Sequence, residues 1–189
     1  KRIDVMERSI IRVTNLFDDW LLMQRMSLGF HEVSNRYVAL RGFIYALMDE
    51  VAFRDQVTLE FTFQEEVTVL WDASLVKRVI HNLLDNAKRH GDSSRGFVLQ
   101  VGVDNDFVTI SVVDFGLTPF ALIRARLWEA SDYEDDRFEL RNESGLGSAL
   151  VAKAIDMLGG RVEYAASDPG SEIGLNATIL LPIEIKNDS

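Results

Sequence analysis

The first thirty residues have the hydrophobic pattern of an amphipathic helix. Their apolar side chains recur in alternating steps of three and four, which places them on one stripe of an α-helix: Ile3, Met6, Ile10, Val13, Phe17 and Trp20. Such a stripe favours a helix that packs against another helix in a bundle, although a helix folded onto its own domain would show it too. Gly29 predicts the end of this helix.

A second helical pattern runs from Val38 to Val51, and the polar residues 54–56 interrupt its spacing. The period then changes to two, because Leu59, Phe61 and Phe63 alternate with polar residues. Val67 to Trp71 follows after a polar turn. These two segments predict a pair of neighbouring strands.

A third helix is expected after Asp72, because its carboxylate can accept hydrogen bonds from the free backbone amides of a first helical turn. The buried face of this helix would consist of Leu75, Val76, Val79, Ile80, Leu83, Leu84 and Ala87. Two long strands are predicted next, from Phe97 to Val103 and from Phe107 to Val113.

Between Leu117 and Ser144 the apolar residues no longer follow a regular period, and residues 132–136 form an acidic run. This stretch predicts a long mobile loop. Helical spacing resumes from Ser148 to Leu158. Two closing strands follow, joined by a Pro169-Gly170 turn: Arg161 to Ala165 and Ile173 to Leu181. We therefore predict an α+β fold, a long helix followed by a two-layer sandwich whose helices cover one face of a mixed sheet.

The composition excludes several classes of function. Lys and Arg number 20 against 30 Asp and Glu, a net charge of −10, which argues against a nucleic-acid binder because phosphate neutralisation needs clustered cations. The chain has no cysteine, so disulfides, thiolate zinc sites and cysteine nucleophiles are excluded. No apolar run approaches the roughly 20 residues that span a bilayer.

The helix after Asp72 carries a polar stripe that could bind a metal and phosphate. Asn82 and Asn86 are four residues apart and share a face, and Arg89 and His90 continue it. An amide oxygen is a hard ligand suited to Mg²⁺, and a guanidinium pairs with phosphate oxygens. A solvated helix face would show the same residues.

Two further features could complete such a site. Asp114 ends an apolar strand and Gly116 follows, so a carboxylate that can accept from the amine of a base lies beside backbone that can approach a ligand closely. The segment from Ser144 to Ser148 opens a helix with two glycines, and the free amides of a helix N-terminus bind anions. Each feature alone is common.

In their order and spacing, the three features resemble the ATP-binding catalytic domain of sensor histidine kinases, within the fold shared with gyrase, Hsp90 and MutL. Asn82-x-x-x-Asn86-Ala resembles the N box of that family, Asp114-x-Gly116 its first glycine box, and Gly145-Leu146-Gly147 its second. Residues 117–144 resemble its ATP lid, and the likeness extends from about Tyr37 to Pro182.

The resemblance implies a Bergerat-type ATP-binding fold and a division of the chain. Residues 1–28 would be the second helix of a dimerisation and phosphotransfer bundle, and 29–36 a linker. Residues 37–184 would be the catalytic ATP-binding domain, and 185–189 a tail. The phosphoacceptor histidine would lie on a first helix upstream of Lys1.

The resemblance also implies roles for individual residues. Asn82, Asn86 and Arg89 would be the catalytic residues, with Asn86 holding Mg²⁺ and Arg89 contacting phosphate. Asp114 would bond the adenine amine, with His90 beside the nucleotide. The remaining contacts to ATP would come from the glycine boxes, namely Gly116, Gly145, Leu146 and Gly147.

The implied reaction is transfer of the γ-phosphoryl group of ATP to a histidine outside this sequence. ATP-hydrolysing relatives of the fold have a glutamate base where this chain has Asn82, and an amide cannot activate water, so a kinase is favoured over an ATPase. The implied partners are ATP, the upstream phosphoacceptor helix, the receiver domain of a response regulator and a second copy of the chain. We expect a cytoplasmic domain, in a full-length protein that can be anchored in the inner membrane.

Three departures from the family pattern favour an alternative. Thr118 and Pro119 stand near the place of a second glycine in the first box, Glu143 replaces a glycine, and Ser148 replaces an apolar residue. The alternative is a degenerate pseudokinase that acts as a nucleotide-sensing or dimerisation module. His31, which is followed by Glu as in a phosphoacceptor box, is assigned to the connecting segment because too few residues separate it from Asn86 for two bundle helices.

Overall fold

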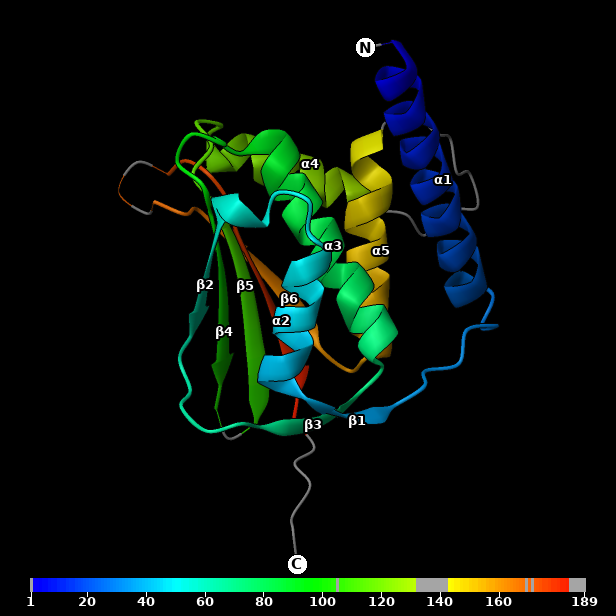
Figure 1. Ribbon diagram of the computed structural model, residues 1–189, viewed down its shortest axis with the longest axis vertical. Coiled ribbons are helices and arrows are strands. Elements are labelled where there is room, and N and C mark those ends of the chain that lie inside the picture. The colour runs from blue at the N-terminus through cyan, green and yellow to red at the C-terminus, as the bar shows by residue number, and fades with distance from the viewer. Residues whose placement is uncertain (1, 105, 132–142, 169, 171, 184–189) are drawn as a thin grey trace, which may run out of the picture.

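The computed structural model describes residues 2–104, 106–131, 143–168, 170 and 172–183 of the 189-residue chain. A long helix, α1 (Arg2–Ser27), lies beside an α/β sandwich (Figure 1). The acidic run at residues 132–136, Pro169 and the tail at 185–189 lie outside the described residues. No helix in the described ranges is both long and apolar enough to cross a membrane.

The sandwich contains a mixed five-stranded sheet with the order β2-β4-β5-β7-β6. Its strands are β2 (Val57–Phe61), β4 (Phe97–Val103), β5 (Phe107–Asp114), β6 (Arg161–Ala165) and β7 (Asn176–Pro182). Strand β2 pairs with β4 in parallel, and the other neighbours are antiparallel. The predicted mixed sheet is thus confirmed.

The sheet partner predicted for β2 was wrong. Strand β3 (Thr68–Trp71) does not pair with β2 but forms a separate two-stranded sheet with β1 (Arg36–Ala39). Val38, which we expected inside a helix, lies in β1 opposite Val69. The helix α2 (Leu40–Glu50) begins two residues later. The alternation of apolar residues indicates which face of a strand is buried, but it does not indicate the partner of the strand.

Helices α2, α3 (Ala73–His90) and α5 (Glu143–Met157) cover one face of the large sheet (Figure 1). The predicted inner face of α3 is buried throughout, and it packs with α2, α5 and the strands into one core. The largest fully buried side chains of that core come from all three helices and the central strands: Leu40, Ile44, Leu47, Ile80, Leu84, Phe97, Leu99, Ile110, Leu150, Ile155, Ile179 and Leu181.

Asp72 caps α3 as predicted and also holds the preceding linker. Its Oδ1 accepts hydrogen bonds from the backbone amides of Ser74 and Leu75, at 3.1 and 3.0 Å. Its Oδ2 accepts from the backbone amide of Ser34, at 2.9 Å. One buried carboxylate therefore fixes both the start of α3 and the chain that connects α1 to the sandwich.

Helix α4 (Phe120–Ser131) forms where we expected a loop. The backbone amide of Phe120 donates to the carbonyl of Glu172, and Pro119 forms an isolated bridge with Ile173, so the start of α4 is held against the connection between β6 and β7. This helix was hard to predict because its apolar residues do not form one stripe, and Leu122 is exposed. Strand β7 begins at Asn176 rather than at Ile173, because Ile173 forms an isolated bridge with Pro119 instead of joining the strand.

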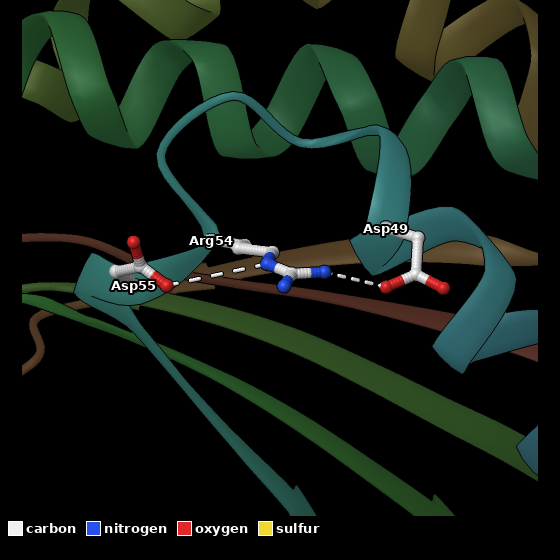
Figure 2. Close-up of polar contacts among 3 residues, drawn as sticks. All are labelled: Asp49, Arg54 and Asp55. Carbon is white, nitrogen blue, oxygen red and sulfur yellow. Dashed lines mark hydrogen bonds and ion pairs between the residues drawn. The ribbon is translucent and has the colours of Figure 1, made fainter.

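Asp49, Arg54 and Asp55 form a small polar cluster at the C-terminal end of α2. Figure 2 shows Arg54, in the 3₁₀ turn η1 (Arg54–Gln56), between two carboxylates: its Nη1 lies 2.6 Å from Asp49 Oδ1, and its Nε lies 4.0 Å from Asp55 Oδ1. All three side chains are exposed, so the cluster contributes little to stability.

Helix α1 contacts the sandwich with its C-terminal half. Met26 is buried in the common core, and the Arg78 Nε atom on α3 lies 2.6 Å from Asp19 Oδ1 on α1. Between residues 6 and 17, the apolar stripe is exposed at Met6, Ile10, Val13 and Phe17. The predicted helix is confirmed, and its role in a bundle stays a prediction. His31 follows in the irregular segment before β1, outside any helix.

Candidate functional site

A small cavity lies between α3, α5 and the sheet, and it brings two of the predicted site residues together. Asn86 from α3 and Asp114 from the end of β5 both line it. The other described lining residues are Leu83, Ala87, Val112, Ser148, Val151, Tyr164, Leu175 and Ala177. The cavity measures about 20 Å³, which is room for about one water molecule. An amide and a carboxylate therefore face one shared space.

Asp114 is held in a setting that suits recognition of a hydrogen-bond donor. Its side chain is 4% exposed, and its Oδ1 accepts from the backbone amide of Gly116 at 2.8 Å. Burial raises the pKa of this carboxyl above its usual range, while the backbone amides of Gly116 and Leu175 and the charge of His90 oppose the rise. A carboxylate has about four lone-pair sites, so it can accept from a ligand amine as well.

The end of α3 and the turn after β5 are in close backbone contact. A Cβ atom on Gly116 would lie 2.9 Å from the carbonyl oxygen of His90. A Cβ on Gly91 would lie 2.8 Å from the Cβ of Asp114 and 2.6 Å from the carbonyl oxygen of Ala87. Only glycine fits at either position, and Asp114 is thereby placed against the last turn of the helix that carries Asn86.

Asn82 is on α3 and faces α5, and it is not among the described residues that line the cavity. Its Nδ2 donates to the carbonyl of Arg78 at 3.2 Å. Its Oδ1 occupies the space beside Gly147, where a Cβ would lie only 2.7 Å away. The structure thus places this predicted catalytic residue in the packing between the two helices.

Arg89 and His90 are exposed at the C-terminal end of α3, and neither lines the cavity. The carbonyl of His90 packs against Gly116, which places both residues beside the turn that follows Asp114. Their predicted phosphate and nucleotide contacts stay predictions.

The second glycine box forms the first turns of α5. Gly145 is the third residue of α5, where backbone amides have no acceptor within the helix, as an anion site requires. Leu146 is buried, and Ser148 lines the cavity. The serine that departs from the family pattern therefore faces the site.

Comparison with known proteins identifies the family. The model of the histidine kinase-, DNA gyrase B-, and HSP90-like ATPases matches residues 71–185, which is more than half of the chain. The chain belongs to this family. The resemblance drawn from the N box and the two glycine boxes is therefore confirmed.

Curated relatives of this ATPase-family domain are named as sensor histidine kinases or sensor proteins. The sensor histidine kinase MtrB of Mycolicibacterium paratuberculosis is 27% identical over 188 residues, covering 95% of this chain and 32% of the relative. The sensor protein CreC of Escherichia coli is 33% identical over 109 residues, covering 57% of this chain and 22% of CreC. The chain thus spans about a third, or less, of the length of these relatives.

Solved structures confirm the fold. Full-length ShkA in complex with AMPPNP superposes with a TM-score of 0.70 at 21% identity, covering 97% of this chain and 38% of ShkA. The histidine kinase AdeS of Acinetobacter baumannii superposes with a TM-score of 0.65 at 18% identity, covering 98% of this chain and 84% of AdeS.

The sequence did not single out several residues of the site. Tyr164 and Ala177 line the cavity from β6 and β7, and they were visible only as inward positions of two strands. Gly91 was visible only as a residue that ends a helix. Gly174 has a φ of +69°, and a Cβ there would lie 2.9 Å from the carbonyl oxygen of Asp114, yet its sequence context resembles an ordinary turn.

The chemistry of this ATPase-family site fits a nucleotide with a bound Mg²⁺. A buried carboxylate can accept from the adenine amine, an asparagine oxygen is a suitable magnesium ligand, and the first turn of α5 offers free amides for phosphate. The space between the described walls is much smaller than the roughly 300–1,000 Å³ of typical ligand pockets. A purine would therefore need more space than these described walls enclose.

Proposed function

We propose that this domain binds ATP with Mg²⁺ and transfers its γ-phosphoryl group to a histidine outside this sequence, as the catalytic domain of a sensor histidine kinase. One observation carries the proposal: Asp114 of the first glycine box and Asn86 of the N box face the same cavity. The membership of the ATPase family and the names of the relatives support it.

Each residue has a defined task in this proposal. Asp114 accepts from the adenine amine and orients the base, and Asn86 offers its side-chain oxygen to Mg²⁺. Arg89 pairs with phosphate, and the free amides at the start of α5 hold the phosphate chain. The metal supplies charge stabilisation when it is bound.

Positioning and charge stabilisation account for most of the catalysis in phosphoryl transfer. The chain places no carboxylate at Asn82, four residues before Asn86, where an ATPase of this fold has its base. We therefore propose that the γ-phosphoryl group passes to an imidazole nitrogen rather than to water, with ADP as the leaving group. The histidine that carries this imidazole is on the upstream bundle helix. A response-regulator receiver domain is the next acceptor of the phosphoryl group.

Titration of the chain with a non-hydrolysable ATP analogue, with and without Mg²⁺, tests the site. We expect saturable binding at tens of micromolar, an affinity of about −6 kcal/mol. Asn86→Ala should weaken binding at least tenfold in the presence of Mg²⁺ and less in its absence. Asp114→Asn should weaken binding of the ATP analogue at least tenfold and reduce the preference for adenine over guanine, because hydrogen bonds to charged groups contribute about 1.5–3 kcal/mol.

Two matched variants serve as controls. Asn35→Ala changes an exposed asparagine of the linker, and Asp55→Asn changes an exposed aspartate of η1, so both should bind like the unmodified chain. The site assignment is wrong if Asn86→Ala and Asp114→Asn bind the analogue as well as these controls do.

A specific contact favours the pseudokinase as a second candidate. The carbonyl of Thr118 accepts from the backbone amide of Gly174 at 3.2 Å, and Pro119 bridges to Ile173, so the chain after Gly116 is fastened to the connection between β6 and β7. A full-length protein that binds the ATP analogue normally but places no labelled phosphate on histidine would be the pseudokinase.

A further inference from the structure

Tyr164 is the one aromatic residue among the described lining of the cavity, and it lies on an edge strand. The alternating burial of β6 turns Val162 and Tyr164 inward, toward α5. Tyr164 pairs with Ala177 on β7, and Ala177 pairs with Val112 on β5. These three residues form a row across the sheet, and Asp114 follows Val112 by two positions on the same face.

Tyr164 and Asp114 line the same small cavity. That cavity holds about one water molecule, so the two residues enclose one small space together with the other lining residues. The centre of the row is Ala177, whose short side chain leaves room for a larger neighbour. Since a directly opposed pair on adjacent strands has Cβ atoms about 5 Å apart, the Tyr164 side chain can fill the room over Ala177.

The Tyr164 hydroxyl is available as a neutral polar group in this apolar wall. Burial raises its pKa to about 12, so it remains protonated at neutral pH. A phenol hydroxyl can both donate and accept a hydrogen bond, and the edge of a purine offers partners for each.

We propose that Tyr164 is a specificity-determining residue of the nucleotide pocket, whose ring closes the pocket beside the purine and excludes purines with a bulky group on the exocyclic amine. The inference rests on the proposed function, in which Asp114 accepts from that amine. The other described lining residues are aliphatic or small polar side chains, so Tyr164 is the largest obstacle to a substituent that extends from the amine across the cavity. Tyr164 lies on β6, an edge strand with a sheet neighbour on one side only. We expect its side chain to move enough there to admit unsubstituted adenine.

The test compares ATP with N6-benzyl-ATP by calorimetric titration in Mg²⁺. The unmodified chain should bind N6-benzyl-ATP at least tenfold more weakly than ATP. Tyr164→Val removes the ring, so the ratio of the two dissociation constants should move at least tenfold toward the larger nucleotide. Tyr164→Phe keeps the ring and should reject N6-benzyl-ATP as the unmodified chain does, with ATP binding reduced by no more than a few fold.

The control is Tyr45→Val, the same change at an exposed tyrosine on α2, which should leave the ratio unchanged. Thermal melting verifies that each variant is folded, and Tyr164→Leu replaces Tyr164→Val if the latter unfolds. Equal binding of the two nucleotides by the unmodified chain, or an unchanged ratio in a folded Tyr164→Val, overturns the inference while the proposed function stands. Failure of the unmodified chain to bind ATP at all overturns the proposed function instead.

Discussion

The buried carboxylate of Asp114 opposes the stability of the fold. Burial raises its pKa, so the folded state binds this proton more tightly than the unfolded state does. The ionised carboxylate therefore destabilises the fold at neutral pH. This penalty disappears as the pH falls below the unfolded pKa of about 3.9, where both states are protonated.

We expect Asp114→Asn to raise the urea midpoint of unfolding at pH 7, because the amide is neutral and its oxygen can still accept from Gly116. The gain should shrink as the pH is lowered through the folded pKa toward 3.5. Urea titrations across this range measure it, with the exposed Asp55→Asn expected to stay within about 0.5 kcal/mol of the unmodified chain. A midpoint at pH 7 that falls in Asp114→Asn would contradict the prediction.

The sequence predicts the residues of the site that carry their own chemical signal. Asn86, Asp114 and Gly116 stand in motifs whose spacing is readable without coordinates, and the structure brings Asn86 and Asp114 to one cavity. Tyr164 and Gly174 carry no such signal. Their places follow from strand register and from the approach of a distant backbone, which arise only when the chain is folded.

At the scale of elements, the ion pair between Asp19 and Arg78 is the clearest polar link between α1 and α3. Its side chains are 12% and 32% exposed, against 74% and 56% for Asp49 and Arg54 in Figure 2. Reduced exposure weakens solvent screening, so the first pair should contribute more than the second.

A double-mutant cycle with Asp19→Asn and Arg78→Gln should give a coupling free energy of about 1 kcal/mol, and each single variant should speed amide exchange in α1. The matched cycle with Asp49→Asn and Arg54→Gln should give at most about 0.5 kcal/mol. Urea unfolding measures both cycles. Equal coupling in the two would show that the packing of α1 does not depend on its ion pair.

Elements with one strong period were predicted well, and elements with mixed signals were not. The face of α3 and the strands β4, β5 and β6 follow from regular spacing that tertiary contacts reinforce. Helix α4 and the pairing of β1 with β3 depend on contacts with segments far along the chain, which no local period records.

At the scale of the whole molecule, the exposed stripe on α1 predicts association. Ile10, Val13 and Phe17 are 63%, 65% and 56% exposed, and an apolar stripe at this spacing is suited to a partner helix. The sandwich covers the C-terminal half of α1 and leaves this stripe accessible to a second copy of the chain.

Ile10→Glu combined with Val13→Glu should convert a dimer into a monomer, because charges cannot be buried in a helix seam without partners. Sedimentation should show the mass fall by half, to 21.4 kDa. Leu28→Glu is the matched control, because Leu28 is an exposed leucine outside the apolar stripe, and this variant should remain dimeric. An unchanged mass in the double variant would discard the bundle interpretation of α1.

The side chain of Asp72 connects two parts of the molecule. Because the same carboxylate anchors Ser34 and the first turn of α3, an apolar replacement releases both at once. The linker that follows α1 and the start of α3, the helix that carries Asn86, therefore depend on one side chain.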